Sequence, residues 1–199
     1  DRWILSSFNE TVREYDRLLE ECEFSEAMRL VYDFAWHELA DWYVEISKVA
    51  PSKETPRILR EVFDGTLRLL HPVMPFATEE MNRILGGEGM LIRSTFPRFD
   101  PALEDAEADR TLERTRLAVS AVRSFRAESR VEGELAGKAP DGVDLMVFSA
   151  LAGVRPTEQF YGSFTATLPA GEVVVEVALS EELRREEIER LRKEISRVE

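Results

Sequence analysis

The sequence predicts a mainly α-helical protein, in which an antiparallel helix bundle is followed by a small α+β segment and by the start of a coiled-coil arm. Apolar residues recur every three or four positions through the first half of the 199 residues, as amphipathic helices require. Past Gly133 the pattern changes to short apolar runs bounded by glycine and proline, which are typical of strands. The predicted domains are residues 1–130, 131–179 and 180–199.

Four helices make up the first part of the predicted bundle. Asp1 is a candidate cap for a helix that runs to about residue 21, and a second helix extends over about 25–49. A third helix covers 57–70, and a short fourth helix ends near Gly86. Short connections between such helices favour an antiparallel arrangement. The expected core stripe of the second helix contains Met28, Val31, Ala35, Leu39, Trp42 and Ile46.

A proline corner separates the third and fourth helices. Pro72 and Pro75 each remove a backbone donor, so together they predict a fixed break between helices. Thr78, Glu79 and Glu80 then supply a hydroxyl and two carboxylates, which suit the positive N-terminal end of a helix. We interpret His71 as a residue that makes a structural hydrogen bond at this corner.

The second half begins with a long helix over about 103–130. A charged helix beginning near Ser180 carries apolar residues at alternating steps of three and four, which is the spacing of a coiled-coil seam. Between these helices the sequence predicts strands over 143–148, 162–168 and 172–177.

Composition narrows the functional classes. The net charge of −13 argues against a generally basic surface for nucleic acid, so any phosphate contact must be local. No apolar run is long enough to span a membrane, and no secretory leader is visible. A single cysteine, Cys22, forms neither an internal disulfide nor a multi-thiolate zinc site. These features predict a cytoplasmic protein with no membrane partner.

The sequence contains no pattern that predicts catalysis or metal binding. His37 and Glu38 followed by Asp41 resemble part of a zinc protease motif, but the second histidine is missing. The glycines between Gly86 and Gly89 lack the spacing and the lysine of a phosphate loop. We therefore expect no metal, no cofactor and no catalytic residue within these 199 residues.

Arginines on the long helix form the best local argument for nucleic acid. At about 100° per residue, Arg116, Arg123, Arg126 and Arg130 fall on one stripe, and nearby glutamates lie elsewhere. Such segregation favours a phosphate-binding edge. The alternative is a row of salt bridges to the many acidic residues of the chain.

Aromatic residues form a second stripe on the helix over 25–49. Tyr32, Trp36 and Tyr43 lie beside the core stripe and offer rings on which unpaired bases stack. Aromatic residues at helical spacing more often belong to a core. On the same helix, Asp41 and Glu45 are interpreted as structural ion-pair partners.

Several segments resemble the anticodon-binding domain of class I aminoacyl-tRNA synthetases. They are Asp1-Arg2-Trp3-Ile4-Leu5-Ser6, Asp41-Trp42-Tyr43, the His71-Pro72 corner with Thr78-Glu79-Glu80, and Arg123-Ser124-Phe125-Arg126-Ala127-Glu128. The resemblance is strongest to valyl-tRNA synthetases, with the isoleucyl and leucyl enzymes as near relatives. It departs at Ser7, where the family usually has a basic residue, and at Met81, Asn82 and Phe96.

The resemblance implies a helical bundle that binds the anticodon stem-loop of a valine-accepting tRNA. In the family, a separate domain of the same polypeptide uses ATP to attach the amino acid, and its His-Ile-Gly-His and Lys-Met-Ser-Lys-Ser signatures do not occur here. These residues are therefore expected to be inactive alone. The candidate tRNA-binding residues are Arg13, Arg17, Tyr32, Trp36, Arg116, Arg123, Arg126 and Lys138.

Two alternatives remain open from the sequence. Part of an isoleucyl- or leucyl-tRNA synthetase, the near relatives in this resemblance, is one alternative. An acidic helical module that recruits a protein partner through its coiled-coil end is the alternative of a different functional class, and the strong acidity favours it.

Overall fold

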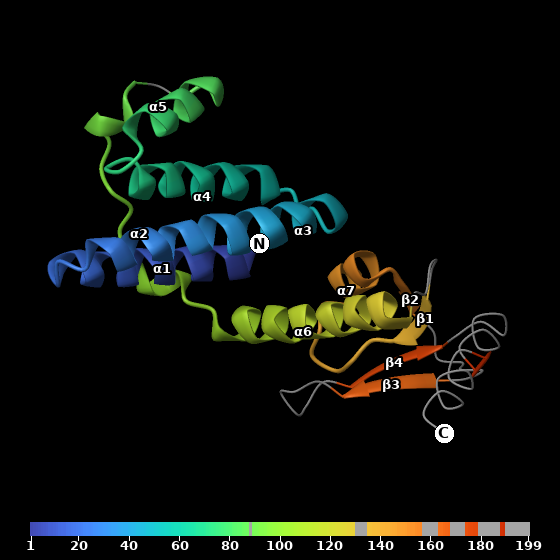
Figure 1. The fold of residues 1–199 in the computed structure, drawn as a ribbon. Coiled ribbons are helices and arrows are strands. Elements are labelled where there is room, and N and C mark those ends of the chain that lie inside the picture. Colours follow the sequence, from blue (N-terminus) through green and yellow to red (C-terminus); the bar gives the residue numbers. More distant parts are fainter. Residues whose placement is uncertain (88, 130–134, 157–162, 168–173, 179–187, 190–199) are drawn as a thin grey trace. The chain divides into compact units, whose positions relative to one another are not determined.

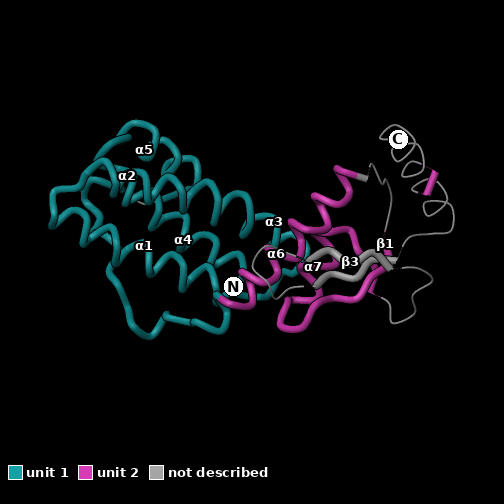
Figure 2. The backbone as a smooth tube through the Cα atoms, turned by 60° about the horizontal axis from the view of Figure 1, so that its bottom comes forward, with its two compact units in different colours: residues 1–109 teal, residues 110–199 magenta. Residues whose placement is uncertain are grey.

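The computed structural model describes residues 1–87, 89–129, 135–156, 163–167, 174–178 and 188–189 (Figure 1). They belong to two compact units, residues 1–109 and 110–199 (Figure 2). The boundary between these units lies within one long helix, between Asp109 and Arg110. The division into three domains at residues 130 and 179 stays a prediction.

The first unit is helical, as predicted. Three long rods lie side by side and alternate in direction: α1, the continuous rod of α2, η1 and α3, and α4 (Figure 1). Helix α5 packs on α4. The bounds are α1 Arg2–Glu20, α2 Phe24–Asp33, π-helix η1 Phe34–Tyr43, α3 Val44–Val49, α4 Thr55–Leu70 and α5 Pro75–Ile84, followed by the 3₁₀ turns η2 Leu91–Arg93 and η3 Pro101–Leu103.

Two apolar clusters form the core between the three rods. Each fully buried aliphatic or aromatic side chain contributes about 1.5–3 kcal/mol, so these clusters supply most of the drive for packing. One contains Ile4, Phe34, Leu39, Tyr43, Ile58 and Val62, and the other contains Val12, Tyr15, Leu18, Ala27, Val31 and Leu69.

The proline corner forms the expected break, because α4 ends at Leu70 and α5 begins at Pro75. His71 makes the structural hydrogen bond predicted for it, with 2.8 Å between its Nδ1 and the Thr78 hydroxyl. Thr78 also donates to the carbonyl of Met74 at 2.9 Å. It is fully buried and lies in the second turn of α5, so the expectation that it stands at the N-terminal end of the helix is wrong.

The second unit contains most of helix α6 and a small mixed sheet. The sheet has the order β2-β1-β4-β3, in which β1 and β2 are parallel and the other neighbours are antiparallel. Parallel neighbours need a crossover, and α7 supplies it between β1 and β2. The bounds are α6 Ala106–Ser129, β1 Leu135–Lys138, α7 Leu145–Ala152, β2 Val154–Pro156, β3 Ser163–Thr167 and β4 Val174–Ala178.

The predicted strand over 143–148 is wrong, because this apolar run belongs to helix α7. A short apolar run fits a buried strand and a buried helix equally well. The flanking residues decide: the Asp144 carboxylate accepts the Val147 N–H at 3.0 Å, and Gly153 ends the helix with a φ of 64°.

The two other predicted strands are confirmed as β3 and β4, with shifted ends. Strands β1 and β2 were not predicted, since they are only 4 and 3 residues long and contain a glycine and a proline. The predicted coiled-coil arm over 180–199 lies outside the described residues, apart from Ile188 and Glu189.

Candidate nucleic-acid interface

Tyr32 and Trp36 form a stacked aromatic pair on the surface of the first unit. Their ring centroids are 6.3 Å apart and their planes differ by 2°. Each side chain is 57% exposed. The predicted aromatic stripe therefore divides: Tyr43 is buried in the core, while Tyr32 and Trp36 present ring surface to solvent. An exposed parallel pair of this kind is a platform on which a further flat ring can stack.

The π-helix η1 explains why the stripe divides. A π-helix closes its hydrogen bonds five residues apart, so side chains after Phe34 are rotated relative to an ideal α-helix. Leu39 and Tyr43 consequently join Phe34 in the core, and Trp42 is only half-buried. The core stripe expected from α-helical spacing is correct at Leu39 but not at Trp42. π-Helical turns are rare and are found frequently at functional sites.

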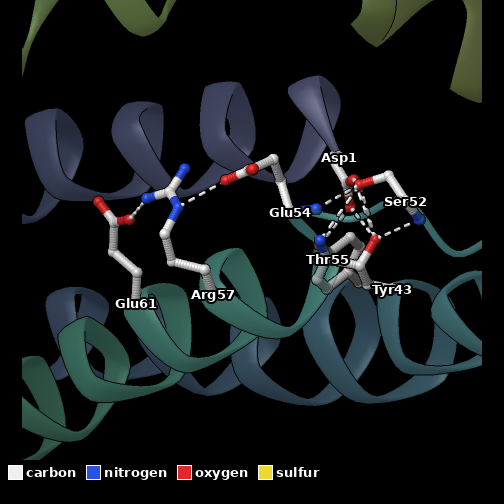
Figure 3. Close-up of polar contacts among 7 residues, drawn as sticks. All are labelled: Asp1, Tyr43, Ser52, Glu54, Thr55, Arg57 and Glu61. Carbon is white, nitrogen blue, oxygen red and sulfur yellow. Dashed lines mark hydrogen bonds and ion pairs between the residues drawn. The ribbon is translucent and has the colours of Figure 1, made fainter.

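A polar cluster around Asp1 fixes the end of η1 (Figure 3). The Asp1 carboxylate accepts a hydrogen bond from the buried Tyr43 hydroxyl at 2.6 Å. It also accepts from the hydroxyls of Thr55, at 2.9 and 3.0 Å, and Ser52. Burial raises the pKa of Tyr43 to about 12, which keeps the phenol protonated and donating. The cluster thus joins the start of α1 to the start of α4 and fixes Tyr43 at the end of η1.

An acidic groove of about 700 Å³ lies in the same unit and is lined by residues of α1, α2 and η1 and by Asp109 of α6. Asp33 and His37, which directly follow Tyr32 and Trp36, belong to this lining. A groove with this charge repels phosphate, but its carboxylate oxygens accept hydrogen bonds from base amino groups. Its acidic residues are Glu10, Glu14, Asp33, Glu38 and Asp109.

Arg13 and Arg17, both candidates from the sequence, are exposed on α1 and paired with carboxylates. Arg13 lies 2.6 Å from Glu10 and 3.3 Å from Glu104. Arg17 lies 2.5 Å from both Glu14 and Glu21, and its hydrogen bond lowers the pKa of Glu14. A phosphate must therefore compete with two carboxylates at each guanidinium.

The arginines of α6 also have partners within the second unit. Arg126 donates to the carbonyl of Gly153 at 2.7 Å, and Arg123 donates to that of Leu151 at 3.3 Å. These carbonyls stand at the C-terminal end of α7, where positive charge is favoured. Arg116 is half-buried, and Arg130 of the predicted stripe lies outside the described residues. Lys138 is exposed at the end of β1.

A basic groove of about 480 Å³ lies between α1, α4 and the segment before α6, and the sequence interpretation missed it. Four arginines line it together with Glu61 and Asp64. The signal was available, because applying the helical 100° rule to the helix over 57–70 places three of these arginines on one face. The arginines are Arg57, Arg60, Arg68 and Arg98.

The two grooves lie on opposite faces of α1. The acidic groove uses Trp3, Ser7 and Glu10, whereas the basic groove uses Leu5, Phe8 and Val12, about half a helical turn away. Charge is thus segregated across one helix of the first unit.

Other site chemistries find no support in the part of the chain that the structure describes. It contains no group of three or more His, Cys, Asp or Glu side chains placed to hold a metal ion. Within the same residues, none of the helices has the length and apolar character needed to cross a bilayer.

Comparisons with known proteins relate this chain to tRNA ligases. Residues 1–139 match the family described as the anticodon-binding domain of tRNA ligase. A valine–tRNA ligase of Streptomyces coelicolor is 37% identical over 195 residues, which is 90% of this chain and 22% of that protein. Valine–tRNA ligases of Geobacillus kaustophilus and Dehalococcoides mccartyi are each 41% identical, over 64% and 66% of this chain and 16% of those proteins.

The chain therefore spans about a fifth of the length of the curated relatives that it matches. The family match covers the whole helical unit, including the aromatic pair and both grooves. This chain belongs to the family of anticodon-binding domains of tRNA ligases.

Proposed function

We propose that this chain binds the anticodon stem-loop of a valine-accepting tRNA as part of a valine–tRNA ligase. The observation that carries the proposal is the exposed, stacked pair of Tyr32 and Trp36 on a domain from this family. The same unit also contains the acidic groove. Proteins recognise single-stranded loops of RNA by stacking unpaired bases on aromatic rings and by hydrogen bonds to base edges. The pair supplies the first kind of contact and the groove supplies the second.

The acidic groove suits the bases of a valine anticodon. Valine codons begin with guanine and uracil, so the last two anticodon bases are adenine and cytosine. Both bases carry an exocyclic amino group, and carboxylates accept hydrogen bonds from such groups. An isoleucine anticodon ends in uracil, whose edge offers a carbonyl oxygen in that position, and a carboxylate repels it. Asp33 and Glu38 of the groove lining are the nearest in sequence to the aromatic pair.

Cationic residues would hold the tRNA backbone around these bases. Arg13 and Arg17 stand next to the groove, because their carboxylate partners Glu10 and Glu14 line it. A phosphate that approaches can replace one carboxylate at each of these guanidiniums. In the second unit, Arg116, Arg123, Arg126 and Lys138 remain proposed contacts.

The whole protein would attach valine to this tRNA with ATP, through a catalytic domain that these residues do not include. We also infer that it works in the cytoplasm, since the exposed free thiol of Cys22 suits a reducing compartment.

Replacing the aromatic pair tests the proposal. Stacking is worth about 1–3 kcal/mol per base, so the Tyr32→Ala/Trp36→Ala variant should bind valine tRNA about tenfold to a hundredfold more weakly. Its salt dependence should not change, because no phosphate contact is lost. The matched control is Phe24→Ala/Phe76→Ala, which removes two exposed rings elsewhere on the unit. Equal affinity of the two double variants for the tRNA would contradict the proposed stacking site.

A further inference from the structure

We propose that the basic groove between α1 and α4 is a second tRNA contact, in which Arg68 and Arg98 bind the phosphodiester backbone. The inference rests on the proposed function, because it names where the backbone lies while the bases occupy the opposite face of α1. It assigns a role to residues that neither the sequence interpretation nor the acidic groove uses.

Two of the four groove arginines are occupied by carboxylates. Arg57 donates to Glu54 at 2.9 Å and to Glu61 at 2.8 Å, along the same helix (Figure 3). Arg60 binds Asp64 at 2.9 Å and also donates to the carbonyl of Leu85. These pairs neutralise the acidic residues of the groove lining.

Among the described residues, no carboxylate forms an ion pair with the other two arginines. Arg68 makes only a long hydrogen bond, 3.4 Å from its Nη1 to the carbonyl of Thr95, and its enclosed Nε has no partner among the described residues. Arg98 is exposed and forms no ion pair or hydrogen bond with any residue that the structure describes. An enclosed donor without a partner costs about 1–3 kcal/mol, and a phosphate oxygen would remove that cost.

The groove is held in shape by contacts that leave these guanidiniums in place. Asn9 binds the backbone of Asp100 on both sides, accepting its N–H at 2.8 Å and donating to its carbonyl at 2.9 Å. These two hydrogen bonds fix the segment around Asp100, which includes Arg98. In the groove lining, Gly65 lies against Phe8, and a Cβ at Gly65 would clash with the ring. The site therefore needs little reorganisation when an anion enters.

The distribution of charge explains why an RNA backbone would bind at the basic groove. The chain carries a net charge of −13, and the groove on the opposite face of α1 is lined by carboxylates. Inside that groove the carboxylates repel phosphates, whereas the basic groove attracts them because two of its guanidiniums are not paired with carboxylates. Arginine also suits this role, since its planar fork matches the geometry of a phosphate.

Titration of the 199-residue chain with a 17-nucleotide RNA hairpin bearing a valine anticodon tests the site. The test variants are Arg98→Gln alone and Arg68→Gln/Arg98→Gln. Each lost phosphate contact should flatten the salt slope by about 0.7–0.9, so we expect a change of about 0.7–0.9 for the single variant and about 1.4–1.8 for the double variant. Affinity at low salt should fall about fivefold to fiftyfold, a typical effect of losing charged contacts.

The matched control is Arg29→Gln/Arg93→Gln, which removes two exposed arginines outside the groove and changes the net charge equally. It should retain the wild-type slope. If the test variants also retain the slope while wild type binds, the groove assignment is wrong and the proposed function stands. If wild type does not bind the hairpin, the proposed function fails. The melting temperatures of wild type and Arg98→Gln are then measured with 1 mM tripolyphosphate. If tripolyphosphate does not raise the melting temperature of wild type more than that of Arg98→Gln, the groove proposal fails as well. Binding of tripolyphosphate with an unchanged RNA slope overturns the RNA assignment and leaves a small-anion site.

Discussion

Asp1 shows at the residue scale what a sequence reveals and what it hides. A helix N-cap was the natural prediction, yet Asp1 makes no capping hydrogen bond. Its carboxylate instead binds Tyr43 and Thr55, which are 42 and 54 positions away. Such partners depend on the packing of three helices, so no local pattern predicts them. Aromatic residues at helical spacing were expected mostly in the core, which is correct for Tyr43 but wrong for Tyr32 and Trp36, because the π-helix separates their faces.

Alkaline pH should weaken the fold through Tyr43. The phenol has an ordinary pKa near 10 when unfolded, and burial raises the pKa to about 12 in the folded chain. The folded state then binds the extra proton between these values, so the free energy of unfolding is constant below pH 10 and falls as pH rises towards 12. Urea unfolding of wild type and Tyr43→Phe at pH 8, 10 and 11 measures this.

The Tyr43→Phe variant should be less stable at pH 8, by about 1.5–3 kcal/mol for a hydrogen bond to a charged acceptor. Its stability should then fall less steeply above pH 10. Part of the slope remains, since burial also raises the pKa of Tyr15. Parallel pH profiles for the two proteins would rule out Tyr43 as a source of the alkaline loss.

Helix α5 shows at the element scale that apolar periodicity does not always mark the buried face. Thr78 and Asn82 face inwards, where the first is bound by His71 and the second donates to the Gly89 carbonyl at 3.0 Å. Phe76 and Ile84 are 90% and 68% exposed. The break before α5 was predictable because proline acts locally, but its orientation depends on distant hydrogen bonds. Helix α7 was missed for a different reason: its caps at Asp144 and Gly153 were visible in the sequence and carried the decisive signal.

Helix α7 should lose stability when Arg126 is replaced. The guanidinium donates to the Gly153 carbonyl at the helix end, a charged hydrogen bond worth about 1.5–3 kcal/mol. We expect Arg126→Gln to speed amide hydrogen exchange in α7 and to leave α1 and α4 unchanged. Arg110→Gln, an exposed arginine on the same α6, is the control and should exchange like wild type. Unchanged protection of α7 in Arg126→Gln would show that this contact is not structural.

Charge is organised in the first unit on a larger scale than any single motif. The net charge of −13 suggested that phosphate contacts must be local, and the structure contains a basic groove and an acidic groove on opposite faces of α1. The helical bundle and the family were predictable, because apolar spacing and the Asp1–Ser6 and His71–Glu80 segments are local signals. Which arginines are neutralised by carboxylates could not be predicted, since Arg13 pairs with Glu104, 91 positions away in the sequence.

Anticodon reading is the central claim, and one base tests it most directly. Affinity of the chain should be measured for a valine tRNA transcript and for the same transcript with the third anticodon base changed from cytosine to uracil. The change replaces an amino donor by a carbonyl at the acidic groove, so we expect binding to weaken about tenfold to a hundredfold, as a mismatched base edge does. The salt dependence should stay the same. Equal affinity for the two transcripts would contradict the claim that this domain reads the anticodon.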